Sequence, residues 1–176
     1  MDKEISIILA VDDKNWLGKN WGLAWNLSSD MKYFKRITTR TKDKNKQNAL
    51  IMWRKTWESI PKKFRPLPWR INCILSRKAK KNLNKDILWF NSLNNCIKKL
   101  RNNKNIENIF IIGWANLYNN SLKDSNLNKI YITKVKWDFN CDVFFNWIPD
   151  NFKLIKKSKK IEENSIKFNF LVYKKI

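Results

Sequence analysis

Apolar residues in this chain gather in short runs that alternate with patterns of helical spacing. Nearly continuous apolar runs bounded by polar residues are typical of buried parallel strands. Leu93, Ile97 and Leu100 lie at helical spacing and predict a helix. A short stretch of helical character also follows Met52. The runs predict strands at Ile5 to Val11, Ala49 to Met52, Ile71 to Leu75, Ile87 to Phe90 and Ile109 to Ile112.

The last third of the chain has a different pattern. Strands are predicted at Lys129 to Val135, Phe152 to Lys157 and Ile166 to Tyr173, with no convincing helix between them. We expect these strands to form an antiparallel edge on a parallel sheet. The polar, mainly basic stretch Thr38 to Asn48 is predicted to be a surface loop. The alternation of strand and helix in the earlier part places the chain in the α/β class.

The segment Leu23 to Ile37 predicts the first helix, with Ser28 as its N-cap. Asp30, Phe34 and Ile37 fall on one side of this helix, with Met31 beside them. A carboxylate on an apolar face needs a partner. It either complements the positive end of the helix dipole or serves a functional site, and the local pattern leaves both interpretations open.

The composition narrows the class of protein. A chain of 176 residues fits one domain, expected to span residues 1–176. It contains no apolar run of membrane-spanning length and opens on charged residues, so we expect a cytoplasmic protein without a membrane anchor. Cys73, Cys96 and Cys141 show no paired spacing and the chain has no histidine, so neither disulfides, nor a metal site, nor a histidine-based triad is expected.

The formal net charge is +22. Clustered Lys and Arg would favour nucleic-acid binding, but here the charge is spread along the chain with no basic arm. Abundant Lys, Asn and Ile are what AT-rich coding would give. We therefore do not expect nucleic-acid binding, although a positive field would speed encounters with anionic small molecules.

Four segments of the chain are informative in their order: LAWNLSSDMKYFKRI from Leu23, IMWRKTWESIP from Ile51, RPLPWRINCILSR from Arg65 and IFIIGWANLY from Ile109. This is the order found in the dihydrofolate reductase family, and the chain resembles this family from about Ile5 to Phe145. The resemblance implies an α/β fold with a central, mainly parallel sheet of about eight strands, about four flanking helices and an antiparallel C-terminal hairpin. It also implies a monomer that reduces 7,8-dihydrofolate to 5,6,7,8-tetrahydrofolate with NADPH, supplying folate cofactors for thymidylate, purine and amino-acid synthesis.

The resemblance assigns the substrate side. Asp30 would bind the 2-amino group and ring N3 of the pterin and assist protonation at N5. Trp25 would hold an ordered water near Asp30, Thr133 would hydrogen-bond the carboxylate, and Leu23 would complete the catalytic group. Ile8 and Phe34 would sandwich the pterin. The other implied substrate contacts are Met31, Ile60, Leu67 and, on the glutamate α-carboxylate, Arg70.

The resemblance also assigns the cofactor side. Arg54 and Lys55 would read the extra phosphate of NADPH, although two basic residues in so basic a chain also have a plain surface interpretation. Tyr118 would lie near the nicotinamide. The remaining implied cofactor contacts are Ala10, Leu17, Gly18, Thr56, Leu75, Ser76, Arg77, Ile112, Gly113 and Trp114.

The chain departs from the family pattern through tryptophan. It has 3 Gly and 10 Trp. Trp25 and Trp57 stand where the family has tryptophan, and the resemblance does not assign Trp89 and Trp147. At Gly113-Trp114 the family has a cis Gly-Gly peptide beside the cofactor. The positions where the family has glycine are Trp16, Trp21, Trp53, Trp69, Trp114 and Trp137.

Six bulky side chains at tight turns would overpack the protein, at about 1 to 3 kcal/mol per site. We therefore hypothesise that the source organism reads UGA as glycine and that the printed sequence translates UGA as tryptophan. The alternatives are an inactive family member, a related pyrimidine reductase of riboflavin synthesis, which would not need Asp30, and a basic nucleic-acid-binding domain on the same scaffold.

Overall fold

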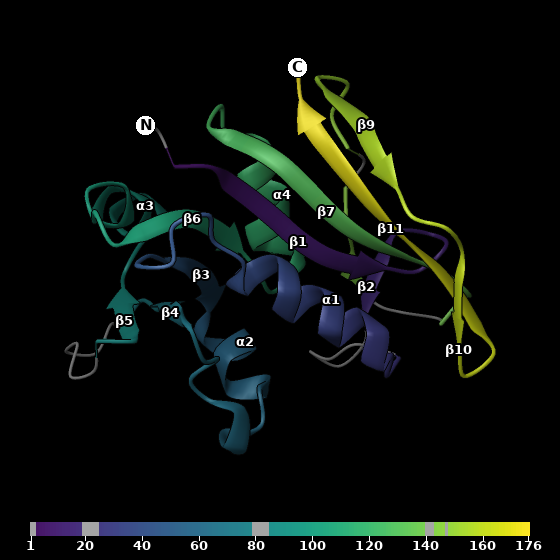
Figure 1. Ribbon diagram of the computed structural model, residues 1–176, viewed down its shortest axis with the longest axis horizontal. Helices are drawn as coiled ribbons and strands as arrows, with labels where there is room; N and C mark the ends of the chain where they lie inside the picture. Colours follow the sequence, from purple (N-terminus) through teal and green to yellow (C-terminus); the bar gives the residue numbers. More distant parts are fainter. Residues whose placement is uncertain (1–2, 19–24, 79–84, 140–142, 147) are drawn as a thin grey trace.

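The fold is built on one large, strongly twisted sheet (Figure 1). The computed structural model describes residues 3–18, 25–78, 85–139, 143–146 and 148–176. Six strands of the sheet run parallel, in the order β7, β1, β6, β3, β4 and β5. Their bounds are Ile5–Val11 for β1, Gln47–Trp53 for β3, Arg70–Leu75 for β4, Ile87–Phe90 for β5, Ile106–Ile111 for β6 and Leu127–Lys136 for β7.

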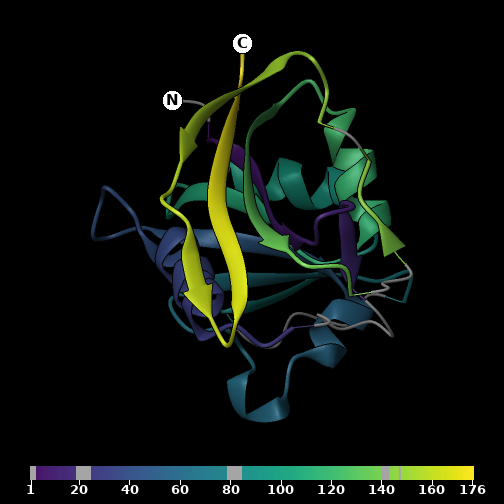
Figure 2. The same ribbon diagram turned by 90° about the vertical axis from the view of Figure 1, so that its right-hand side faces the viewer.

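The C-terminal part of the chain adds the antiparallel edge. The long strand β11 (Ile166–Lys175) pairs antiparallel with β7 on one side. On its other side it pairs with β10 (Ile161–Glu163) near its start and with β9 (Phe152–Lys157) near its end. The sheet therefore has nine strands but is eight strands wide, because β9 and β10 pair with the same side of β11. Figure 2 shows the molecule from the side of these C-terminal strands. This arrangement confirms the predicted α/β class with a mainly parallel sheet and an antiparallel C-terminal hairpin.

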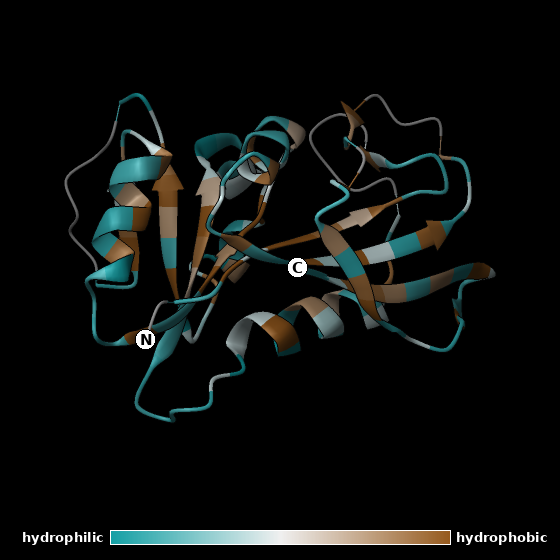
Figure 3. Cartoon of the chain, turned by 90° about the horizontal axis from the view of Figure 1, so that it is seen from above, coloured by the Kyte–Doolittle hydropathy of each residue, from teal (hydrophilic) through white to brown (hydrophobic). Residues whose placement is uncertain are grey.

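Helices cover both faces of the sheet (Figure 3). The helices α1 (Ser28–Thr39) and α2 (Arg54–Ser59) lie on one face, and α3 (Leu93–Arg101) and α4 (Ala115–Leu122) lie on the other. The apolar residues of β1 are nearly continuous because side chains on both faces of this strand are covered by helices. Ile7 and Leu9 belong to the cluster beneath α3 and α4, whereas Ile8 belongs to the cluster beneath α1 and α2, so both faces of the strand are buried.

The structure corrects the sequence predictions at several points. The strand β7 is parallel to β1, so the antiparallel edge comprises only β9, β10 and β11. The loop predicted from Thr38 to Asn48 is shorter, because α1 continues to Thr39 and β3 begins at Gln47. Elements that the pattern did not predict are α4, β10, the short 3₁₀ helix η1 (Lys62–Phe64) and the small sheet of β2 (Trp16–Gly18) and β8 (Val143–Phe144).

Ser28 is not the N-cap of α1. Leu27 occupies that position, has an extended backbone and provides no side-chain hydrogen bond, and Ser28 is the first helical residue. The prediction was wrong because the amide groups at the start of the helix are bound by a carboxylate that is distant in sequence. The side chain of Glu163, at the end of β10, accepts hydrogen bonds from the backbone N–H groups of Ser28 and Ser29.

Candidate functional site

A buried carboxyl group lies in the first turn of α1. The Asp30 side chain is only 7% exposed, and the hydroxyl Oγ1 of Thr133 donates a hydrogen bond of 2.6 Å to its Oδ1 atom. Thr133 lies on β7 and is itself buried. Burial raises the pKa of Asp30 above 3.8, the Thr133 hydrogen bond acts in the opposite direction, and the negative charge of Glu163 raises it further. The site thus contains a carboxyl group that holds its proton more tightly than an exposed aspartate does.

Trp25 lies close to the start of the same helix. Its indole is buried and packs against the ring of Phe139, with ring centroids 5.0 Å apart. Its Nε1 atom is buried without a hydrogen-bond partner among the described protein atoms. A buried indole N–H of this kind is available to donate a hydrogen bond to water or to a ligand. Leu23, the other residue predicted here, lies outside the described residues.

An apolar cluster extends from Asp30 along α1. The structure brings together four of the predicted substrate residues, Ile8, Phe34, Ile60 and Leu67, in the cluster beneath α1 and α2. Tyr33 packs in the same cluster and stacks on Phe170 of β11 with a centroid separation of 3.8 Å. The side chain of Met31, which the sequence placed beside them, is 52% exposed and lies outside the buried part of the cluster.

Arg70 lies at the far end of this cluster. Its guanidinium is buried, lies 5.8 Å from the ring centroid of Phe34 and donates hydrogen bonds to Thr38 Oγ1 at 2.8 Å and to the Pro68 carbonyl at 3.0 Å. It forms no ion pair with the described acidic residues. Burial lowers the pKa of Arg70 to about 10, so it keeps its charge at neutral pH. A buried cation with neutral partners is suited to bind an anionic ligand.

A second group of predicted residues meets where β6 ends. Gly113 has a φ of +127°, and a Cβ atom at this position would lie 2.7 Å from Thr56 Oγ1 of α2. Only glycine fits this close approach of two chain segments. The Tyr118 hydroxyl accepts a hydrogen bond from the Gly113 N–H at 2.6 Å and donates one to the Ile8 carbonyl at 3.1 Å. This link joins the β6–α4 turn to strand β1, beside buried Ile112.

The other residues predicted for the cofactor surround the carboxyl ends of the parallel strands. Arg54 is exposed and pairs with Glu58 at 2.6 Å, within α2. Lys55 and Arg77 are exposed, whereas Leu75 and Ser76 are buried at the end of β4, and Ala10 and Leu17 are buried near the end of β1. Gly18 ends β2. This edge is where open α/β sheets bind ligands.

The described tryptophans that the resemblance assigns to family glycine positions differ in exposure and in backbone conformation. Trp53 and Trp114 are half-buried at the N-caps of α2 and α4, with φ values of −70° and −120° that any residue adopts. Trp69 has a φ of +60°, a conformation that favours glycine, although its side chain is 64% exposed. Trp16 is half-buried.

One expectation about these positions is wrong. Trp69 and Trp137 are more than half exposed, so they do not overpack the interior. The cis peptide among the described residues is Arg65–Pro66, so the Gly113–Trp114 peptide is trans and differs from the cis Gly-Gly peptide of the family pattern. Trp21 and Trp147 lie outside the described residues.

The buried carboxyl group, the apolar cluster that ends at Arg70 and the glycine turn near α2 define an α/β domain with a candidate ligand site on the face of the sheet that α1 and α2 cover. A family model for dihydrofolate reductase matches residues 4–175, so this chain belongs to the dihydrofolate reductase family. The predicted family membership is confirmed.

Two similar proteins align with almost the whole chain, and a third aligns with part of it. The chain is 36% identical to a dihydrofolate reductase of Drosophila melanogaster, covering 97% of both chains. It is 34% identical to that of Aedes albopictus, covering 99% of this chain and 98% of the relative. A dihydrofolate reductase of Saccharomyces cerevisiae is 47% identical over 120 residues, which are 65% of this chain and 57% of the relative.

Two other kinds of feature are absent from the described residues. They contain no helix long and apolar enough to cross a membrane. Nor do they contain a group of three or more His, Cys, Asp or Glu side chains placed to hold a metal ion. Cys73 and Cys96 are buried and free, and Cys141 lies outside the described residues.

Proposed function

We propose that this protein reduces 7,8-dihydrofolate to 5,6,7,8-tetrahydrofolate with NADPH. The observation that carries the proposal is the buried Asp30 carboxyl, hydrogen-bonded by Thr133 at 2.6 Å, at one end of an apolar cluster whose other end is the buried cation Arg70. A folate is a flat, amidine-edged ring joined through an aromatic group to a carboxylate. The three parts of the site match these three parts in order.

Asp30 would recognise and orient the ring. A carboxylate opposite the amidine edge of the pterin forms paired, charge-assisted hydrogen bonds. Because burial raises the pKa of Asp30, its carboxyl group can hold a proton closer to neutral pH than an exposed aspartate does. The Trp25 indole N–H has no protein partner among the described atoms and would hold a water for proton delivery to N5.

The rest of the substrate would lie along α1. Ile8 and Phe34 would contact the ring, Ile60 and Leu67 the benzoyl group, and Arg70 the α-carboxylate of the glutamate. The Arg70 fork is already oriented by Thr38 and Pro68. A guanidinium fixed in this way loses little conformational entropy when it binds a carboxylate.

NADPH, when bound, supplies the hydride that reduces C6 of the pterin. The residues suited to hold it are the basic pair Arg54 and Lys55, Ser76 and Arg77 at the end of β4, and the Gly113 turn. The close approach of Gly113 to Thr56 fits a turn that must leave room for a ligand. The indoles of Trp53 and Trp114, at the starts of α2 and α4, are the part of this surface that does not suit a dinucleotide.

Glycine at these positions would remove the mismatch. We therefore propose that the codons for Trp16, Trp21, Trp53, Trp69, Trp114 and Trp137 are UGA, read as glycine in the source organism. The φ of +60° at Trp69, directly after Pro68, supports glycine there, because a Pro-Gly pair is the usual centre of a type II turn. Sequencing the gene tests the proposal: Trp25 and Trp57 should have UGG codons, and a mixture of codons at the six positions would contradict it.

The activity is tested by NADPH oxidation with dihydrofolate, using the printed chain and a chain with glycine at the six positions. Activity that is confined to the glycine chain supports both the reductase function and the decoding proposal. Activity in both chains supports the function and contradicts the steric argument. If both folded chains are inactive, the proposed function is wrong.

A further inference from the structure

Glu163 connects the C-terminal hairpin to the start of α1. Its Oε1 atom accepts a hydrogen bond of 2.6 Å from the Ser28 N–H, and its Oε2 atom accepts one of 3.0 Å from the Ser29 N–H. These two amides have no partner inside the helix, because the first four N–H groups of an α-helix precede any available carbonyl. Leu27 provides no side chain that could cap the helix. Glu163 provides the cap instead, from a position 135 residues away from Ser28.

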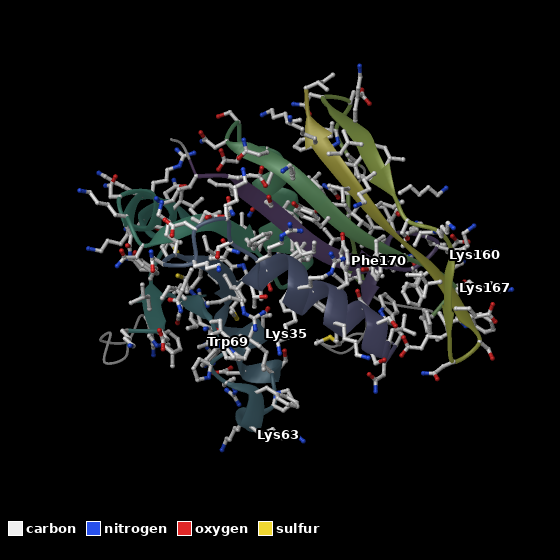
Figure 4. All side chains as sticks on the ribbon, in the orientation of Figure 1. Lys35, Lys63, Trp69, Lys160, Lys167 and Phe170 are labelled. Atoms are coloured by element: carbon white, nitrogen blue, oxygen red, sulfur yellow. The ribbon has the colours of Figure 1, made fainter. Side chains whose placement is uncertain are left out.

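The hairpin holds Glu163 in a defined position. Glu163 pairs with Ile166 across a two-residue turn in which Asn164 and Ser165 both have positive φ, as in a type I′ turn. The second strand of the hairpin, β11, pairs with β7 and sets Phe170 opposite Thr133. Figure 4 shows Phe170 beside α1, and Lys160 and Lys167 on the hairpin. The strand that bonds Asp30 and the hairpin that caps its helix therefore belong to one continuous part of the sheet.

We propose that Glu163 is a positioning residue for Asp30, which fixes the first turn of α1 against the sheet and places a permanent negative charge beside the catalytic carboxyl. Asp30 is the third residue of α1, so a shift of the first turn would move it relative to Thr133. This inference rests on the proposed reductase function, in which Asp30 is the catalytic group.

The charge has a direct consequence for Asp30. The hydrogen bonds from Ser28 and Ser29 lower the pKa of Glu163 to about 2, so Glu163 is ionised throughout the physiological range. Its carboxylate accepts the hydrogen bonds of two amides that would otherwise be free to stabilise the Asp30 anion at the helix start. Its negative charge also repels the Asp30 anion. Among the described residues, the groups that interact with the Asp30 carboxyl are Thr133 of β7, Glu163 of β10 and Tyr33 of α1. Of these three groups, Glu163 is the one that carries a charge.

The neighbouring Glu162 provides a matched control. It lies on the same strand but faces the opposite way, and its carboxylate lies 3.7 Å from Lys167 Nζ. Glu162→Gln and Glu163→Gln therefore remove the same charge from adjacent residues, but only the second change affects the start of α1.

The test is a ¹³C NMR titration of the Asp30 carboxyl carbon in the ligand-free protein. Glu163→Gln should lower the pKa of Asp30, and Glu163→Asp, which keeps the charge, should restore most of the wild-type value. Exchange of the Ser28 and Ser29 amide hydrogens should be faster in Glu163→Gln. Glu162→Gln should resemble the wild type. An unchanged Asp30 titration in Glu163→Gln, or an equal shift in Glu162→Gln, overturns the proposal.

A second variant approaches the contact from the other side. Ser28→Pro removes both the amide that bonds Oε1 and the Ser28 hydroxyl, which also interacts with Glu163, and is compatible with the first position of a helix. The pKa of Glu163 should rise from about 2 towards 4.5, and an unchanged Glu163 titration would overturn the contact even if Glu163→Gln failed to fold. In turnover assays, Glu163→Gln should shift the pH profile of kcat/KM to lower pH. Because the NMR titration needs no activity, an inactive protein leaves this inference testable while contradicting the proposed function.

Discussion

The two halves of the candidate site are built by different means. On the side proposed for the folate, side chains hold one another: Thr133 bonds Asp30, Glu163 caps the helix that carries it, and Thr38 orients Arg70. On the side proposed for the cofactor, the geometry depends on main chain at turns, where Gly113 approaches Thr56 and two helices begin. A site made from side chains is preserved by the residues themselves. A site made from turns depends on the absence of side chains, and this is where tryptophan replaces family glycines.

The largest effect is expected for Asp30→Asn. General acid–base groups contribute about 10²- to 10⁴-fold to turnover, so kcat with dihydrofolate should fall by that order. The fold should survive, because the amide keeps the shape and can still accept the Thr133 hydrogen bond. A kcat within threefold or so of the wild type would remove Asp30 from the mechanism.

The same variant should change stability in a defined direction. The folded-state pKa of Asp30 is raised above 3.8, so the stabilising contribution of the carboxyl is complete below pH 3.8 and is lost as the pH rises through the folded pKa. At pH 7, Asp30→Asn should therefore melt at a higher temperature than the wild type, with a smaller gap at pH 3. Melting curves at both pH values measure this difference. A lower Tm at pH 7 would show that the ionised carboxyl is well solvated.

The second effect concerns the cofactor side. The double variant Trp53→Gly, Trp114→Gly should bind NADPH about tenfold to a hundredfold more tightly than the printed chain, because relieving an overpacked position is worth about 1 to 3 kcal/mol. Titration of NADPH fluorescence gives the Kd. Trp69→Gly is the matched control, since it makes the same change at an exposed turn. Equal affinity in the double variant and the control would contradict the steric argument.

A smaller effect is expected for Thr133→Val, which removes the hydroxyl but keeps the side-chain shape. The hydrogen bond to Asp30 is worth roughly 1.5 kcal/mol, so kcat/KM should fall about tenfold. Because this hydrogen bond lowers the pKa of Asp30, its loss should move the pH profile to higher pH. This shift is opposite to that expected for Glu163→Gln. Thr133→Ser should keep the wild-type profile, and a shift in the same direction as Glu163→Gln would mean that the hydroxyl does not favour the ionised form.

The smallest effect is expected for Trp69→Gly. A side chain at positive φ costs about 1 to 2 kcal/mol, which glycine would relieve. The variant also loses the contact of Lys35 Nζ with the indole, 5.0 Å from the ring centroid and visible in Figure 4, which is worth about 0.5 to 1 kcal/mol. We expect the Tm to rise by about 2 to 4 °C. A fall of the same size would show that the indole contributes more than its backbone costs.

Local patterns predicted most of the elements, and the ends of three of them. Ile5–Val11, Ile87–Phe90 and Phe152–Lys157 were predicted with the bounds that the structure has, because Asp, Asn, Glu or Ser residues flank each run. The helix α4 was not predicted. The motif from Ile109 to Tyr118 indicates a glycine turn, and the N-cap of the helix that follows is Trp114, which provides no side-chain hydrogen bond and so none of the usual signals of a helix start.

The sequence by itself determined the α/β class, the family and the helix on which Asp30 lies, because apolar runs and motif order are local properties of the chain. The family resemblance predicted the hydrogen bond between Thr133 and Asp30, which the structure contains across 103 residues, whereas only the tertiary structure decided that Glu163, in place of Ser28, caps the helix. Both contacts depend on strand register. A strand that slipped by one residue would turn Thr133 or Glu163 to the opposite face of the sheet, and no local pattern in α1 records which register its distant partners adopt.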